Sequence, residues 1–88
     1  MIYYEGSAQD TFTQVNLGNA TNFMIINDST TSDLELSFDG VSVEGKVKAG
    51  DPPLTFRDVC DFSKQILTLW VRNHTAGSAT PFRIWAWR

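Results

Sequence analysis

Hydrophobic and polar residues alternate with a period of two along most of the chain, while the spacing typical of an amphipathic helix is nearly absent. In Asp33–Phe38, for example, the leucines fall on one side of an extended chain, and Glu35 and Ser37 fall on the other. Such runs recur about every 8–12 residues between turn-forming residues. The pattern predicts an all-β fold, a small antiparallel β-sandwich or jelly roll of seven to eight short strands, with residues 1–88 forming a single domain.

The strongest local signal is Asp39–Gly40, which lies between two alternating runs. An Asp-Gly pair in this position favours a two-residue turn, so we expect a β-hairpin over Leu34–Lys48. Pro52–Pro53 should stop strand pairing after this hairpin, because proline cannot donate a hydrogen bond to a neighbouring strand. The expected strands are Met1–Glu5, Thr11–Leu17, Asn22–Asn27, Asp33–Phe38, Val41–Glu44, Leu54–Phe56, Gln65–Arg72 and Phe82–Trp87.

The inward faces of these strands should form the hydrophobic core. The residues expected there are Phe23, Ile25, Leu34, Leu36, Phe38, Val41, Val43, Leu67, Leu69, Val71, Phe82 and Ile84. Three strands, however, carry large apolar side chains on both faces, whereas a strand of a two-layer sandwich buries only one. A single copy would therefore expose several of Met24, Ile26, Ile66, Trp70, Trp85 and Trp87.

Contiguous exposed apolar surface marks interaction sites, and Trp and Arg are frequent at binding hot spots. We therefore expect the outer face of the last strand to contact another protein chain, together with Trp70 if its strand lies alongside. The alternative is that loops of the same domain cover each tryptophan. Tyr3 and Tyr4 either anchor an N-terminal arm on a neighbour or lie in an edge strand. The residues expected at an interface are Trp70, Arg83, Trp85, Trp87, Arg88, Tyr3 and Tyr4.

Composition narrows the function classes. The net charge is −3 and the seven basic residues are dispersed, so we expect no nucleic-acid partner. Cys60 is the single cysteine, so the chain cannot form an internal disulfide. A domain of this size often needs a further source of stability, and oligomerisation is therefore favoured. A secretory signal and a membrane-spanning segment are not expected, because no apolar run has the necessary length.

Catalytic chemistry is also not expected. His74 is the single histidine and lies in a run of small polar residues, with no nucleophile spaced to use it. Acidic residues flank Cys60, and these would not activate a thiol. The aspartates lie in turns without calcium-loop spacing. We expect no enzyme activity, no cofactor and no metal, while a sugar-binding module that stacks its aromatic residues on glycans stays an alternative.

The order of the motifs NDS…LELSFDG, GDPPLTF, ILTLWVR and PFRIWAWR, over about Asn16 to Arg88, resembles a class of short virion proteins of tailed bacteriophages. These motifs are turn, hairpin and core signals and include no catalytic residue. The chain departs from the pattern at Pro52–Pro53 and in DVCDFSK, where a plainer connection is expected.

The resemblance implies a β-sandwich structural protein of the virion, made in the host cytoplasm. The expected role is a capsid decoration or cement protein that stabilises contacts between major capsid subunits, with a neck or tail adaptor as the alternative. Its expected partners are copies of itself, as a homotrimer, and the major capsid protein or other virion proteins, without nucleic acid or membrane.

Overall fold

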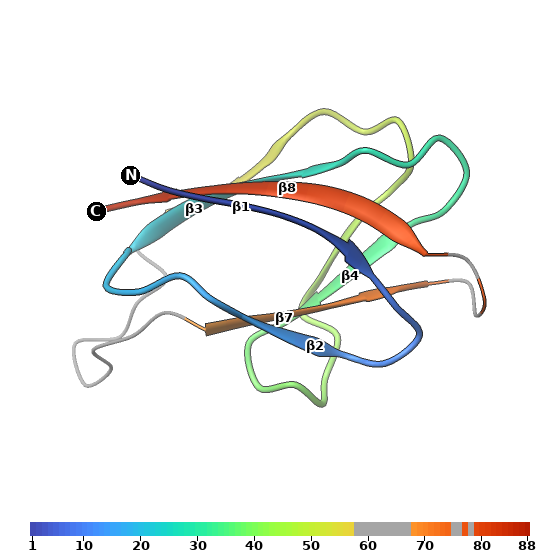
Figure 1. Ribbon diagram of the computed structural model, residues 1–88, viewed down its shortest axis with the longest axis horizontal. Helices are drawn as coiled ribbons and strands as arrows, with labels where there is room; N and C mark the ends of the chain where they lie inside the picture. The colour runs from blue at the N-terminus through green and yellow to red at the C-terminus, as the bar shows by residue number, and fades with distance from the viewer. Residues whose placement is uncertain (58–67, 75–76, 78) are drawn as a thin grey trace.

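The computed structural model of the chain describes residues 1–57, 68–74, 77 and 79–88. Over these residues the chain forms eight strands in two four-stranded antiparallel sheets that pack face to face (Figure 1). This architecture confirms the predicted all-β sandwich. The strands are β1 (Ile2–Ala8), β2 (Thr13–Asn16), β3 (Asn22–Asn27), β4 (Leu34–Ser37), β5 (Gly45–Val47), β6 (Leu54–Phe56), β7 (Thr68–Asn73) and β8 (Thr80–Trp87).

The strand order is that of an eight-stranded jelly roll. The first sheet has the order β1–β8–β3–β6, and the second sheet has the order β2–β7–β4–β5. The nested pairings β4–β5, β3–β6, β2–β7 and β1–β8 make the chain one long antiparallel ribbon that wraps alternately into the two sheets. In Figure 1, β1 and β8 lie together above β2 and β7, and the two ends of the chain lie side by side.

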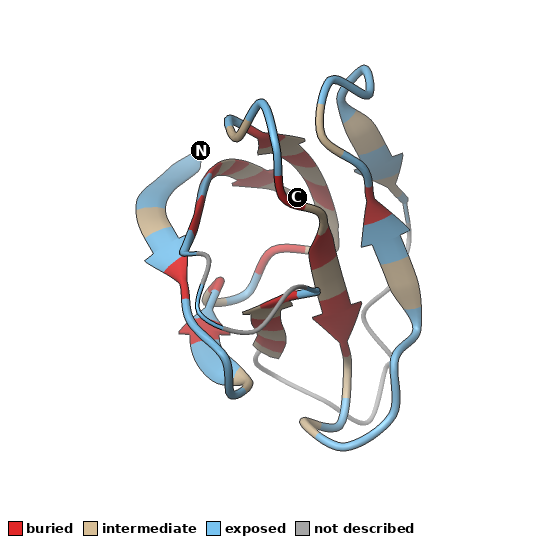
Figure 2. Cartoon of the chain, turned by 90° about the vertical axis from the view of Figure 1, so that its right-hand side faces the viewer, coloured by how far each residue is buried: buried red, intermediate tan, exposed pale blue. Residues whose placement is uncertain are grey.

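The alternation of the sequence becomes an alternation of burial along the strands (Figure 2). In β8, Ile84 is buried between the sheets, whereas its neighbour Trp85 is only partly covered. Among the expected core residues, burial is confirmed for Phe23, Ile25, Leu34, Leu36, Leu69, Val71, Phe82 and Ile84, and Phe38 packs against them. Leu67 lies outside the described residues. Further buried core residues, not expected from the sequence, are Ala8, Val15, Leu17, Ala20, Val47 and Ala86.

The expected hairpin joins β4 to β5, but strand pairing ends sooner than the sequence predicts. Residues 38–44 form a wide loop in place of a two-residue turn, and β5 begins only at Gly45. The expected strand Val41–Glu44 is therefore wrong. Its two valines are wrong as core residues, because Val41 is 79% exposed and Val43 is 47% exposed.

The side chain of Asp39 explains the wide loop. Its Oδ1 accepts hydrogen bonds from the backbone N–H groups of Val41 and Ser42, both at 2.8 Å, and from Ser37 Oγ at 2.8 Å. These bonds, above all the one from Ser42, lower the pKa of Asp39 to about 2. Because the carboxylate satisfies these N–H groups, they are not free to pair with β4.

Gly40 in the same loop has a φ of +79°, and a side chain there would collide with Trp70. A Cβ atom at Gly40 would lie 3.0 Å from Trp70 Nε1. We expect Gly40→Ala to lower the free energy of unfolding by about 2 kcal/mol through backbone strain and this contact. Gly50→Ala is the matched control, because Gly50 has a φ of +81° with open space around it, and should cost about 1 kcal/mol. Urea denaturation measures both, and equal losses would contradict the close packing of Trp70.

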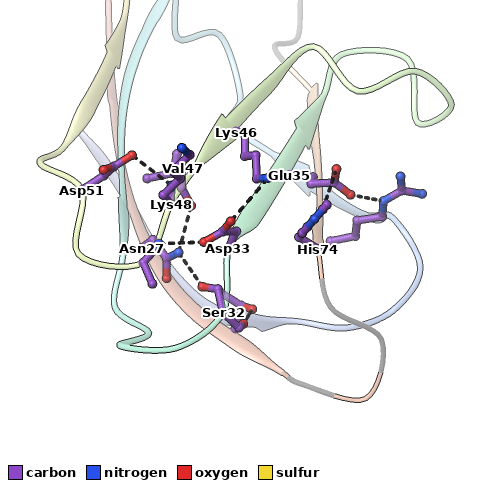
Figure 3. Close-up of polar contacts among 12 residues, drawn as sticks. Asn27, Ser32, Asp33, Glu35, Lys46, Val47, Lys48, Asp51 and His74 are labelled. Atoms are coloured by element: carbon purple, nitrogen blue, oxygen red, sulfur yellow. Dashed lines mark hydrogen bonds and ion pairs between the residues drawn. The ribbon is translucent and has the colours of Figure 1, made fainter.

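The buried side chain of Asn27, at the end of β3, joins the two sheets (Figure 3). Its Nδ2 donates to the backbone oxygens of Ser32 and Val47, both at 2.9 Å. Its Oδ1 accepts from the N–H of Ser29 at 2.8 Å. Because Val47 belongs to β5, one amide ties the first sheet to the second at this end of the sandwich.

Candidate protein-binding surface

The outer face of the first sheet is largely apolar. Opposite residues of an antiparallel sheet share a face, and the register places Tyr3, Trp85 and Met24 in one row across β1, β8 and β3. We call this outer surface the tryptophan face and define it by Met1, Tyr3, Met24, Ile26, Trp85 and Trp87. All of these side chains are partly or largely accessible, and Met1 and Tyr3 are 88% and 50% exposed.

A groove of about 420 Å³ opens on the tryptophan face. Its lining comes from Met1, Met24, Trp85 and Trp87, so the end of β8 forms the middle of the groove, with β3 on one side and the residue before β1 on the other. Methionine side chains adapt their shape to a ligand, and indole rings offer large rigid apolar surfaces. The groove therefore suits an inserted apolar side chain better than a hydroxyl-rich ligand.

Ion pairs and hydrogen bonds hold the polar groups beside the groove. Arg83 makes a bidentate pair with Asp28, with Nε–Oδ2 and Nη2–Oδ1 distances of 2.7 and 2.8 Å, and this hydrogen bonding raises the pKa of Arg83. The Arg83 guanidinium also lies 5.3 Å from the Trp85 ring centre. On the other side, Tyr3 donates from its hydroxyl to Glu5 Oε2 at 2.6 Å, which raises the Tyr3 pKa. These contacts position the aromatic side chains and bring a polar rim to the groove.

The tyrosine and tryptophan rings of this face also contact each other. The ring centres of Tyr3 and Trp85 lie 5.2 Å apart at an interplanar angle of 50°. Aromatic pairs in such tilted arrangements add attraction beyond the area that they bury. Because β1 and β8 each supply one ring, the pairing of these strands fixes the shape of the tryptophan face.

The outer face of the second sheet is different, because it carries charged side chains that pair with one another (Figure 3). Glu35 accepts a hydrogen bond from Arg72 Nε at 2.8 Å, and its other oxygen lies 3.3 Å from His74 Nδ1. Partial burial acts to raise the pKa of Glu35, but these two partners outweigh it, and the pKa lies below its usual value. Lys46 pairs with Asp33 at 3.4 Å. Such a row is typical of a surface that faces water.

The residues expected at an interface divide between the two faces. Trp85, Trp87, Tyr3 and Arg83 lie together on the first sheet. Trp70 lies on β7 in the second sheet, so its strand does not lie alongside β8, and whether Trp70 contacts another chain stays a prediction. Trp70 packs beside Gly40 of its own domain. The separation follows from the strand order, which a local sequence pattern does not reveal.

Tyr4 and Arg88 also lie apart from the groove. Tyr4 points to the inner side of β1, where its ring stacks on Phe82 with centres 5.8 Å apart. Arg88 follows β8 and is exposed. Tyr3 and Tyr4 both belong to an edge strand, which was one of the two alternatives that the sequence left open. Whether they contact a neighbouring chain stays a prediction.

Two groove residues were absent from the expected interface. The sequence did indicate that Met24 lies on an accessible apolar face, because its strand is apolar on both sides. The same pattern indicated this for Ile26, its neighbour on that face. No sequence feature indicated Met1, since nothing in the local pattern places it beside Trp87. Its position depends on the pairing of β1 with β8, two segments at opposite ends of the sequence.

Within residues 1–57, 68–74, 77 and 79–88, no three His, Cys, Asp or Glu side chains gather where they could bind a metal ion. The turn aspartates have partners of their own, since Asp33 accepts from the backbone of Ala49 and Asp51 from that of Lys48. Across the same ranges, no helix is long and apolar enough to cross a membrane. Cys60 lies outside the described residues.

Comparisons of the chain with protein-family models, with curated proteins and with solved structures find no match. The surface chemistry of the two sheets therefore carries the functional argument.

Proposed function

We propose that the chain is a structural component of a bacteriophage virion, a capsid decoration protein that docks onto its neighbours through the tryptophan face. The observation that carries the proposal is the contrast between the two outer faces of one small sandwich. The second sheet presents paired charges to solvent, while the first presents methionine, isoleucine and tryptophan around a groove. The resemblance of the sequence to short phage virion proteins supplies the kind of partner.

The mechanism is passive. Docking would remove the tryptophan face from water and bury the groove against a capsid subunit. The free energy of that contact would add to the work needed to separate neighbouring subunits, because a ligand that binds only the assembled state stabilises it. Tyr3 and Arg83 lie against the Trp85 ring, so this side chain loses little freedom on binding.

A sugar-binding module is the second candidate, since Tyr3 and Trp85 place two rings on one accessible face. Sugar sites, however, combine stacking with hydrogen-bond partners for hydroxyl groups, and the groove is lined by methionine and tryptophan. The apolar lining favours a protein partner. A neck or tail adaptor would use the same surface, and copy number separates it from a decoration protein: hundreds of copies per particle for decoration, about a dozen or fewer for an adaptor.

The test is binding to particles assembled without the chain, encoded by the same phage. We expect Trp85→Thr to weaken binding by about 30-fold or more, as removal of a central interface tryptophan does. Trp70→Thr is the matched control, because it removes the same ring from the opposite face and should leave the affinity nearly unchanged. Equal effects of the two substitutions would contradict docking through the tryptophan face, and glycan binding that Trp85→Thr abolishes would favour the sugar-binding module.

A further inference from the structure

The four edge strands of the two sheets differ in how well they are protected against pairing with another chain. Natural sheets block their edges with short strands, proline or lysine. β6 has three residues and follows Pro52–Pro53, β5 has three residues with Lys46 at its centre and Lys48 after it, and β2 has four. β1 has seven residues, IYYEGSA, with no proline and no lysine. β1 is therefore the open edge of the described sandwich.

The register shows which backbone groups of β1 point outward. The N–H of Asp28 donates to Pro81 O at 2.9 Å, so the backbone of Pro81 points from β8 toward β3. Direction alternates along a strand, so Phe82, Ile84 and Ala86 point toward β1, where their partners are Gly6, Tyr4 and Ile2. It follows that the N–H and C=O groups of Tyr3, Glu5 and Ser7 face the open edge.

We propose that a second copy of this chain pairs with this edge, β1 against β1 antiparallel, to make one continuous eight-stranded sheet across a two-fold axis. Such a contact is isologous, because the same strand serves both copies. The proposal goes beyond docking on the virion and concerns the free protein. It also differs from the homotrimer expected from the sequence resemblance, since an antiparallel β1 pair closes as a dimer.

The sequence of β1 favours one register for this pairing. Centred on Tyr4, it sets each Tyr3 opposite the partner's Glu5, so hydroxyl and carboxylate meet twice, and it sets Ile2 opposite Gly6, which has no side chain. Centred on Glu5, it would place two carboxylates opposite each other, and like charges in that position are destabilising. Centred on Tyr3, the overlap would be shorter. The Tyr4 register also joins the tryptophan faces of the two copies into one surface.

The decisive variant is Glu5→Pro, measured by sedimentation equilibrium. The N–H of Glu5 faces the open edge, so proline removes no bond between β1 and β8 but prevents pairing with a second copy. We expect the dissociation constant of the dimer to rise at least about tenfold, while circular dichroism and the melting temperature stay close to those of the parent. Glu5→Ala is the matched control, since it loses the same carboxylate but keeps the N–H, and should dimerise with a smaller loss of affinity.

Crosslinking tests the register, with Cys60→Ser as the background. Opposite residues that do not bond to each other have Cα atoms about 4.5 Å apart, a distance that a disulfide spans. Tyr4→Cys should therefore form a disulfide-linked dimer, whereas Ser7→Cys should not, because the two copies of residue 7 would lie about 20 Å apart.

Amide hydrogen exchange gives an independent result. Dilution to the monomer should speed exchange at Tyr3, Glu5 and Ser7, while Tyr4 and Gly6 stay protected by β8. A protein that stays monomeric at high concentration, or a dimer that Glu5→Pro leaves intact, would overturn the proposal. Protection of the odd-numbered amides only when other virion proteins are added would also overturn it, in favour of a strand from a different partner.

Discussion

Asn27→Asp is expected to lower the free energy of unfolding by about 3–5 kcal/mol at neutral pH, enough to unfold much of the protein. The side chains have the same shape, but a carboxylate has no hydrogen to donate. It would remove the bonds that the amide donates to the oxygens of Ser32 and Val47 and would place negative charge against them, 2.9 Å away and out of water. Because burial disfavours the ionised form, we expect the loss to shrink as the pH is lowered and the new carboxyl group takes up a proton.

Urea denaturation at two pH values measures this effect, and Asn16→Asp is the matched control. Asn16 uses only its oxygen, which accepts from the N–H of Gly18 at 2.9 Å in an exposed turn, and a carboxylate accepts equally well. We expect this control to change stability by less than about 0.5 kcal/mol. A small effect at Asn27, similar to that of the control, would show that its amide does not tie the sheets together.

Phe23→Ala should cost about 3–5 kcal/mol, because it opens a cavity at the most densely aromatic part of the core. Phe23 is fully buried, stacks on Phe56 with ring centres 4.7 Å apart and meets the edge of Phe38 at 6.2 Å. The packing of β6 depends on this cluster, since Phe56 is opposite Phe23 in the register. A domain of this size has about 4–13 kcal/mol of stability in all, so the variant would be near the limit of folding.

Phe12→Ala is the control for ring removal in general. Phe12 lies on the outside of the sandwich with the Arg72 guanidinium 4.3 Å above its ring centre, and such an exposed contact contributes about 0.5–1 kcal/mol. Chemical denaturation of both variants gives the comparison. A loss at Phe23 no larger than that at Phe12 would contradict the position of Phe23 at the centre of the core.

The sequence predicts most strands because a strand that buries one face has an apolar residue at every second position, which is a local pattern. The period-two pattern of β3 and β8 survives in the burial of Ile25 and Ile84. It fails at Val41 and Val43, where the residues alternate but the carboxylate of Asp39 takes the backbone groups that a strand would need. The alternating residues there form an exposed loop, and the sequence pattern alone does not distinguish such a loop from a strand.

The candidate surface was predictable only in part. That the outer face of β8 is apolar is visible in Trp85 and Trp87, but the strands that flank it are not. Met24 and Met1 reach the groove because β3 and β1 pair with β8 on its two sides, and Trp70 does not because β7 belongs to the other sheet. These relations join residues far apart in the sequence, and a local pattern carries no information on them.

The place of β8 between β1 and β3 has a consequence for biosynthesis. β8 is the last of these eight strands to be synthesised and lies between β1 and β3, so these two strands wait without their common partner until translation has passed Trp87. The β4–β5 hairpin can form early, but the pairing of Ile2 with Ala86 closes a loop of almost the whole chain, and such closures make folding slow. Until β8 is made, the apolar strand β3 lacks its partner on that side, and exposed apolar surface of this kind favours aggregation.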